Sequence, residues 1–272
     1  MENPSLLRFL VDARGEETSS QQLRDDLMTM LIAGHETTAS ALTWCLFELA
    51  QHPDILAELR AEIDAVCGSS AAGGRFFKAP RTVEMIQKME LTRLCVAESL
   101  RLYPQPPLLI RRALDDDALP PDGAGRRVTV PRAGDVFVAI YTLHRSARYW
   151  PNPDTFDPKR FLRKHTNPDE PDWAGFDPDK WRTSSLYPNE VAADFAYLPF
   201  GGGARKCIGD AFATLEATVA LAALVANFDF DFAAPTDTPD KVGTKTGATI
   251  HTRNGLWMTL SPRGGAAAAA AD

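Results

Sequence analysis

The segment Phe200–Gly209 constrains the fold of this chain more than any other part. It places one cysteine in a glycine-lined loop directly before an apolar run. Glycines permit tight or positive-φ backbone, so amide N–H groups can approach the sulfur of Cys207 closely. Residues 210–228 follow with apolar side chains at helical spacing, which predicts a helix. Cys207 therefore lies near a helix N-terminus, where the helix dipole favours an anionic ligand such as a thiolate.

The same loop carries a second group suited to haem, a cofactor with an iron and two propionates. Arg205 offers a guanidinium fork that can bind a carboxylate. The loop resembles F-x-x-G-x-R-x-C-x-G, the haem-binding loop of the cytochrome P450 monooxygenases, at every fixed position. This resemblance implies that Cys207 is the axial thiolate ligand to the iron of haem b. It also implies that Phe200, Gly203, Arg205 and Gly209 form the cofactor site. A structural cysteine in a glycine-rich turn is the alternative interpretation.

Apolar residues at helical spacing predict a buried helix over residues 21–52, but residues 33–38 interrupt the pattern. Glycine costs about 1 kcal/mol against alanine in a helix, and threonine hydroxyls compete for backbone carbonyls. The string Ala-Gly-His-Glu-Thr-Thr resembles the oxygen-binding kink of the P450 central helix. The resemblance implies that Glu36 and Thr37 relay protons during catalysis and that Ala33 borders the substrate. A solvent-facing His-Glu pair is the alternative, whereas Ala39 excludes the zinc-protease motif H-E-x-x-H.

An acid and a base three residues apart, Glu98 and Arg101, lie on one face of a predicted helix. Such pairs are common on surfaces, but this one is followed by Leu-Tyr-Pro and so resembles the P450 motif E-x-x-R-L-Y-P. In the family an arginine from a later segment completes a buried set, and Arg160 has that position here. Lys159 stands where an acid is usual, which weakens one side contact only. Because an unpaired buried charge is costly, we expect a structural triad that supports the haem loop.

Three further segments, 108–113, 141–146 and 246–256, resemble the plastid carotenoid-ring hydroxylases of plants and algae. By position in the family, Arg112, or less favourably Arg111, would be a second partner for the haem propionates. The residues that fall where the family lines its substrate pocket are Leu109, Ile110, Ala248, Thr249 and Ile250. Ordinary core packing is the alternative for the apolar members of this set.

The fold class expected from these patterns is mainly α with small β-sheets, an incomplete P450 fold that comprises its C-terminal portion. Residues 1–263 would be the C-terminal part of one P450 domain, and residues 264–272 an alanine-rich disordered tail. Further helices are expected over 53–67 and 82–102, strands over 127–130 and 135–140, and an irregular segment over 163–193. Half a haem site would leave apolar surface exposed to water, so we expect a fragment.

Composition excludes some classes of function. Hydrophobic residues make up 44% of the chain and charged residues 24%, as in ordinary globular proteins. The net charge of −7 argues against nucleic acid as a partner. The four cysteines show no disulfide framework, which favours a reducing compartment, and Cys45 and Cys95 are expected to be buried. The longest apolar run, 217–226, is far shorter than the roughly 20 residues of a membrane span, so no spanning helix is expected. The acidic start resembles no targeting segment.

The resemblance implies a haem-thiolate monooxygenase that inserts one oxygen atom of O2 into a substrate C–H bond. Electrons would come from a ferredoxin or a flavoprotein reductase, the substrate would be a lipophilic small molecule such as a carotenoid, and the location would be the plastid. Peripheral association with a membrane stays open. The alternatives are a truncated, catalytically inactive fragment, and a monooxygenase of fatty acids or terpenoids.

Overall fold

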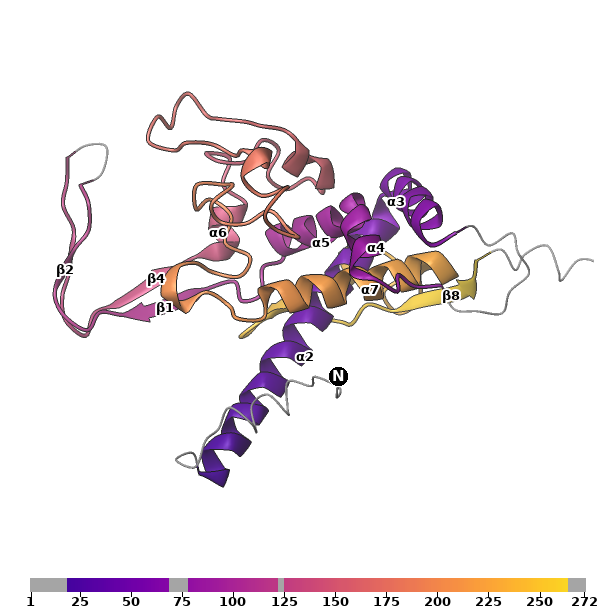
Figure 1. The fold of residues 1–272 in the computed structure, drawn as a ribbon, viewed down its shortest axis with the longest axis horizontal. Helices are drawn as coiled ribbons and strands as arrows, with labels where there is room; N and C mark the ends of the chain where they lie inside the picture. The colour runs from indigo at the N-terminus through magenta and orange to yellow at the C-terminus, as the bar shows by residue number, and fades with distance from the viewer. Residues whose placement is uncertain (1–18, 69–77, 122–124, 264–272) are drawn as a thin grey trace, which may run out of the picture.

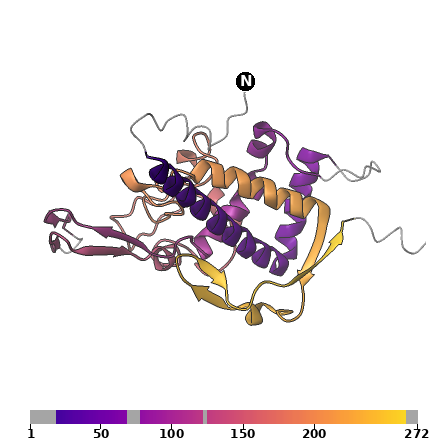
Figure 2. The same ribbon diagram turned by 90° about the horizontal axis from the view of Figure 1, so that it is seen from below.

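The computed structural model describes residues 19–68, 78–121 and 125–263; the expected alanine-rich tail lies outside these ranges. Four helices form the main body: α2 (Ser20–Gln51), α3 (Pro53–Cys67), α5 (Glu90–Leu102) and α7 (Asp210–Asn227). Helices α5 and α7 contact each other, and both contact α2 and α3. Figure 2 shows α2 alongside α7. The expected helices over 21–52, 53–67 and 210–228 are therefore confirmed within one residue at each end.

The helix expected over 82–102 is divided at Met89 into α4 (Val83–Lys88) and α5. Thr82 caps α4, since its side chain accepts a hydrogen bond from the N–H of Met85 at 3.3 Å. The start of α5 is capped from another element. The carboxylate of Glu62, on α3, accepts the backbone N–H groups of Leu91 and Thr92 at 2.7 and 2.9 Å. These N–H groups have no partner within their own helix, so a residue distant in sequence fixes where α5 begins.

The strands form four antiparallel pairs. They are β1 (Leu109–Arg112) with β4 (Asp135–Val138), β2 (Asp117–Ala118) with β3 (Thr129–Val130), β5 (Phe228–Phe232) with β8 (Met258–Pro262), and β6 (Thr244–Thr246) with β7 (Ile250–Thr252). The β2–β3 hairpin extends away from the helical body (Figure 1). Short elements complete the fold: α6 (Ile140–His144), α8 (Pro239–Val242), and the 3₁₀ turns η1 (Pro158–Leu162), η2 (Pro178–Lys180) and η3 (Gly203–Arg205). Mainly α structure with small sheets is thus confirmed.

Two hydrophobic clusters hold these elements together. The larger one lies between α2, α3, α5 and α7 and includes Cys45 and Cys95, which are buried as expected. The smaller one is aromatic and is built from Trp150, Phe161, Trp173, Phe176, Trp181 and Tyr197. The irregular segment 163–193 supplies three of these rings. It therefore needs no regular helix or strand to stay ordered, because it packs on its own aromatic core.

Helix α7 corrects the expectation that no segment is long and apolar enough to cross a membrane. Its 18 residues have a mean hydropathy of 1.3, which meets the minimum for a span in length and composition. The helix nevertheless packs against α2, α3 and α5. Buried residues along it include Ala217, Leu221 and Val225. We therefore assign α7 as a core helix of this domain.

A large apolar surface is exposed, as expected. The N-terminal half of α2 projects from the helical body (Figure 1), and its Leu31 and Ile32 are 64% and 59% exposed. Ile208 and Phe212, at the start of α7, are 86% and 70% exposed. Such a surface is typical of a face that a ligand or another segment of protein covers.

Candidate functional site

The cysteine loop is closed by one backbone hydrogen bond. The N–H of Cys207 donates to the carbonyl of Phe200 at 2.9 Å, so residues 200–207 form a compact turn at the head of α7. Gly201 and Gly203 have φ values of 74° and 69°, which favour glycine. Phe200 packs edge-on against Tyr187, with ring centroids 4.9 Å apart. Gly209 has φ −91° and is the N-cap of α7, so no positive φ requires glycine there.

Lys206 anchors the loop, a role that sequence reasoning missed. Its Nζ lies 3.0 Å from both carboxylate oxygens of Glu190 and 3.3 Å from Asp210. The hydroxyl of Tyr187 donates to the same Asp210 at 2.6 Å. Lys206 thus faces back into the protein while Cys207 and Arg205 remain exposed. The four-residue spacing of Lys206 and Asp210 is a signal that the sequence offers, whereas the contact with Glu190, 16 positions away, is visible only in the structure.

The residues at this site fit a haem. Cys207 is exposed, and the flanking Ile208 and Phe212 present apolar surface beside it. Strand β1 adjoins the loop, since Leu109 Cδ1 lies 3.6 Å from the position that a Cβ on Gly201 would take. Within the described residues no group of three or more His, Cys, Asp or Glu side chains could hold a bare metal ion. One soft ligand between apolar side chains suits a flat macrocycle that brings its own four nitrogen ligands.

The two arginines expected at the propionates differ in their contacts. Arg205 ends η3 and is exposed. Arg112 donates from Nε and from its terminal nitrogen to Asp135, both at 2.8 Å, and this pairing raises the pKa of Arg112. Arg111 donates to the carbonyl of Ile110 at 2.9 Å. A propionate at Arg112 would therefore compete with Asp135, and its role stays a prediction.

Helix α2 continues through residues 33–38. The hydroxyl of Thr37 donates to the carbonyl of Ala33 at 2.7 Å, the usual way in which a threonine inside a helix satisfies its side chain. Ala33 is exposed, and nothing lies within 4 Å of the position that a Cβ on Gly34 would take. This face of α2 is open beside Thr37.

Glu36 contacts the turn between β6 and β7. Its Oε1 accepts the Thr249 hydroxyl at 2.6 Å and lies 2.8 Å from His251 Nε2. The hydrogen bond from Thr249, followed by that from His251, lowers the pKa of Glu36. Glu36 therefore has partners on another element, while its side chain is still 42% exposed and the neighbouring His35 is exposed. Sequence reasoning placed Thr249 in a substrate pocket and did not identify His251.

The other expected substrate residues divide by burial. Ile110 and Ala248 are exposed, and Leu109 is half-buried against the cysteine loop. Ile250 is 2% exposed and belongs to the main core, so the core interpretation applies to it. Gln105, which sequence reasoning missed, holds this strand: its Oε1 accepts the Ile250 N–H at 2.9 Å.

The structure brings Glu98, Arg101 and Arg160 together in the interior. Arg101 donates twice to the Glu98 carboxylate, at 2.8 and 2.9 Å, and Arg160 Nε donates to it at 2.9 Å. Glu98 and Arg101 are fully buried, and Arg160 is 4% exposed. The remaining guanidinium N–H groups donate to backbone carbonyls between His144 and Thr155. Lys159 pairs with Glu58 at 2.5 Å, outside the set.

His144 connects this triad to the cysteine loop. Arg101 donates to the backbone carbonyl of His144 at 2.7 Å. The Nε2 of the His144 ring accepts the N–H of Leu198, also at 2.7 Å. Burial lowers the pKa of His144 to about 3, so the imidazole is neutral and can accept that hydrogen bond. The triad thus supports the chain just before Phe200 through one histidine.

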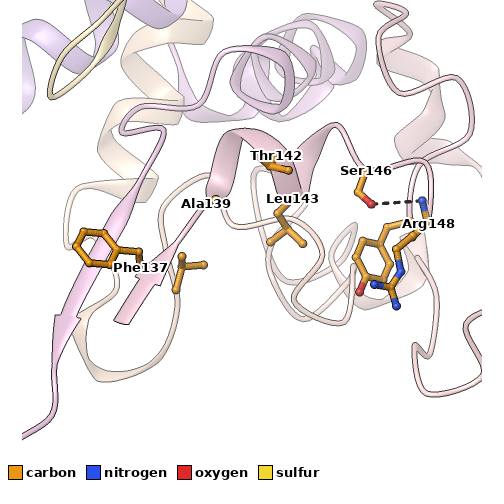
Figure 3. Close-up of a pocket in the computed structure, with 8 residues that line it drawn as sticks. Phe137, Ala139, Thr142, Leu143, Ser146 and Arg148 are labelled. Carbon is orange, nitrogen blue, oxygen red and sulfur yellow. Dashed lines mark hydrogen bonds between the residues drawn. The ribbon is translucent and has the colours of Figure 1, made fainter. Parts of the chain in front are cut away.

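A separate hollow of about 370 Å³ lies between β4 and α6. Figure 3 shows Phe137 and Leu143 on its wall, and Arg148, whose N–H donates to Ser146. It is lined by none of the expected site residues, so we assign it no chemistry.

Comparison with known proteins agrees with this geometry. Residues 2–258 match the family described as Cytochrome P450. The chain is 51% identical over 265 residues to "Cytochrome P450 97B2, chloroplastic" of Glycine max, covering 97% of this chain and 44% of that protein. It is 43% identical over 261 residues to "Protein LUTEIN DEFICIENT 5, chloroplastic" of Arabidopsis thaliana, covering 96% of this chain and 37% of that protein. It is 40% identical over 263 residues to "Carotene epsilon-monooxygenase, chloroplastic" of the same plant, covering 96% of this chain and 41% of that protein.

The chain therefore spans less than half the length of these relatives. Its match nevertheless includes the cysteine loop, the acid–alcohol pair of α2 and the buried triad. The sequence motifs, the mainly α fold and the extent of the match lead to one assignment: the chain belongs to the cytochrome P450 family.

Proposed function

We propose that this chain carries the haem-thiolate half of a monooxygenase that inserts one oxygen atom of O2 into a C–H bond of a carotenoid ring. The observation that carries this proposal is Cys207, exposed at the head of α7 between apolar side chains. The carotenoid substrate is supported by the name of the relative called a carotene epsilon-monooxygenase and by the three segments that resemble carotenoid-ring hydroxylases.

Each residue of the site would have a distinct part. Haem, when bound, supplies the oxygen chemistry, which a thiolate ligand favours. Cys207 would be that ligand, and Arg205 would bind a propionate. Glu36, which contacts the turn between β6 and β7, and its neighbour Thr37 on α2 would pass protons from solvent to the reacting oxygen, as a carboxylate and a hydroxyl can. Exposed Ile110 and Phe212 would exclude water from the bound cofactor.

The partners and location follow from the same likeness. The names of the relatives describe chloroplastic proteins, which supports a plastid location. The proposed chemistry needs O2 and two electrons per turnover. A ferredoxin or a flavoprotein reductase would supply the electrons. Association with a membrane surface would suit a lipophilic substrate.

Changing Thr37 to alanine is expected to leave haem binding intact but to lower the hydroxylated product formed per electron consumed, by roughly a hundredfold. The reason is that the hydroxyl would be lost while Cys207 is untouched. Product and electron consumption measured together report this ratio. Thr43→Ala is a matched control, because Thr43 also donates to a carbonyl four residues earlier, at 2.8 Å, yet lies outside the motif. Equal ratios for the two variants would contradict the role of Thr37.

The function itself is tested on the haem-loaded protein that contains this chain. We expect a haem-thiolate signature in the carbon monoxide spectrum of the reduced protein, and hydroxylated carotene when an electron donor is supplied. Parallel assays with a fatty acid and a terpenoid separate the alternative substrates. A normal spectrum with no turnover of any substrate would favour the inactive alternative.

A further inference from the structure

Glu36 and two residues from a distant part of the chain bring three polar atoms within hydrogen-bond distance of one another. Glu36 Oε1, Thr249 Oγ1 and His251 Nε2 form a triangle with sides of 2.6, 2.6 and 2.8 Å. Glu36 lies on α2, His251 lies on β7, and Thr249 immediately precedes β7. The opposite ring nitrogen of His251, Nδ1, lies 3.3 Å from the hydroxyl of Ser40, one helical turn after Glu36.

The three short distances limit where the protons of this group can lie. A carboxylate oxygen and an unprotonated ring nitrogen both accept hydrogen bonds, so a separation of 2.8 Å requires a proton between Glu36 Oε1 and His251 Nε2. The Thr249 hydroxyl supplies a second donor to the same oxygen. The Ser40 hydroxyl lies within hydrogen-bond distance of Nδ1, so both ring nitrogens of His251 have partners.

We propose that Thr249 and His251 are positioning residues that hold the Glu36 carboxylate against the turn between β6 and β7, beside Thr37. The proposal rests on the proposed function, in which Glu36 supplies protons to the oxygen site. It adds that the acid is held by two residues about 210 positions away in sequence, on the turn that resemblance assigns to the substrate pocket.

The charged and titratable groups around Glu36 belong to three elements. His35 is its neighbour on α2, His251 faces it from β7, and Lys245 pairs directly across from His251 on β6. The His35 side chain makes no hydrogen bond among the residues that the structure describes, and its influence on the pKa of Glu36 is smaller than that of His251. The hydrogen bonds from Thr249 and His251 are therefore the two largest influences on the pKa of Glu36.

The test compares protonation of Glu36 in variants of the haem-loaded full chain. Infrared difference spectra against Glu36→Gln isolate the carboxylic acid band of Glu36 as pH is lowered. In Thr249→Val and His251→Phe we expect the midpoint of this band to move to higher pH, with the larger shift in Thr249→Val, because hydrogen bonds to the ionised form favour it. Product per electron is expected to fall roughly tenfold in both variants, with haem content unchanged.

Conservative and matched variants separate positioning from general disturbance. His251→Gln keeps an N–H donor and is expected to restore the midpoint and the product ratio. His35→Gln removes the imidazole that makes no hydrogen bond and is expected to shift the midpoint less than His251→Phe. An unchanged midpoint in both Thr249→Val and His251→Phe would overturn the proposal, and so would failure of His251→Gln to restore it. If no variant or parent hydroxylates carotene, the proposed function fails, while the infrared midpoint still tests the contact.

Discussion

Changing Cys207 to alanine is expected to abolish the haem-thiolate signature of the reduced protein with carbon monoxide. Cys45 and Cys95 cannot replace it, because both are fully buried. Burial also raises the pKa of both thiols, so neither offers a thiolate. Optical spectra after reconstitution with haem measure the effect.

Two variants make this result specific. Cys67 is half-buried at the end of α3, so Cys67→Ala removes a thiol outside the site and should leave the signature intact. Cys207→His offers an imidazole ligand and is expected to retain haem with a spectrum that lacks the thiolate signature. A haem-thiolate spectrum from Cys207→Ala would refute the assignment of the ligand.

Changing Arg101 to alanine is expected to destabilise the fold by about 3–5 kcal/mol, as removal of one partner from a buried ion pair generally does. The variant would leave the Glu98 carboxylate with the guanidinium of Arg160 and the backbone N–H of Asp157, each of which donates to it at 2.9 Å. It would also remove the donor to the carbonyl of His144, the residue that holds Leu198 before the cysteine loop. Urea denaturation measures the loss in free energy of unfolding, and haem titration measures its effect on the loop.

An exposed pair provides the comparison for this variant. Lys241 and Asp237 lie four residues apart at 2.5 Å, and both side chains are 51% exposed. Lys241→Ala is expected to leave the free energy of unfolding nearly unchanged, since solvent screens such pairs. If Arg101→Ala and Lys241→Ala cost the same, the buried triad has no special structural role.

The features that the sequence predicted correctly depend on short-range order. The extents of α2, α3 and α7 follow from apolar spacing along one helix. The pair of Glu98 and Arg101 follows from their three-residue separation, and the turn at Cys207 follows from its glycines. Resemblance to the family added Arg160 to this pair. Arg160 is 62 residues from Glu98 in the sequence, so no local pattern signals their contact.

Only the tertiary structure decided the contacts between residues that are distant in sequence. Glu62 determines where α5 begins, and Lys206 faces Glu190 whereas Arg205 stays exposed. His251 meets Glu36 across 215 positions. By itself the sequence predicted where α2, α3 and α7 form and which cysteine is the candidate ligand to iron, because backbone propensity and side-chain chemistry act over a few residues. The folded chain decided which polar groups become partners, because a hydrogen bond depends on distance in space and the sequence records only order along the chain.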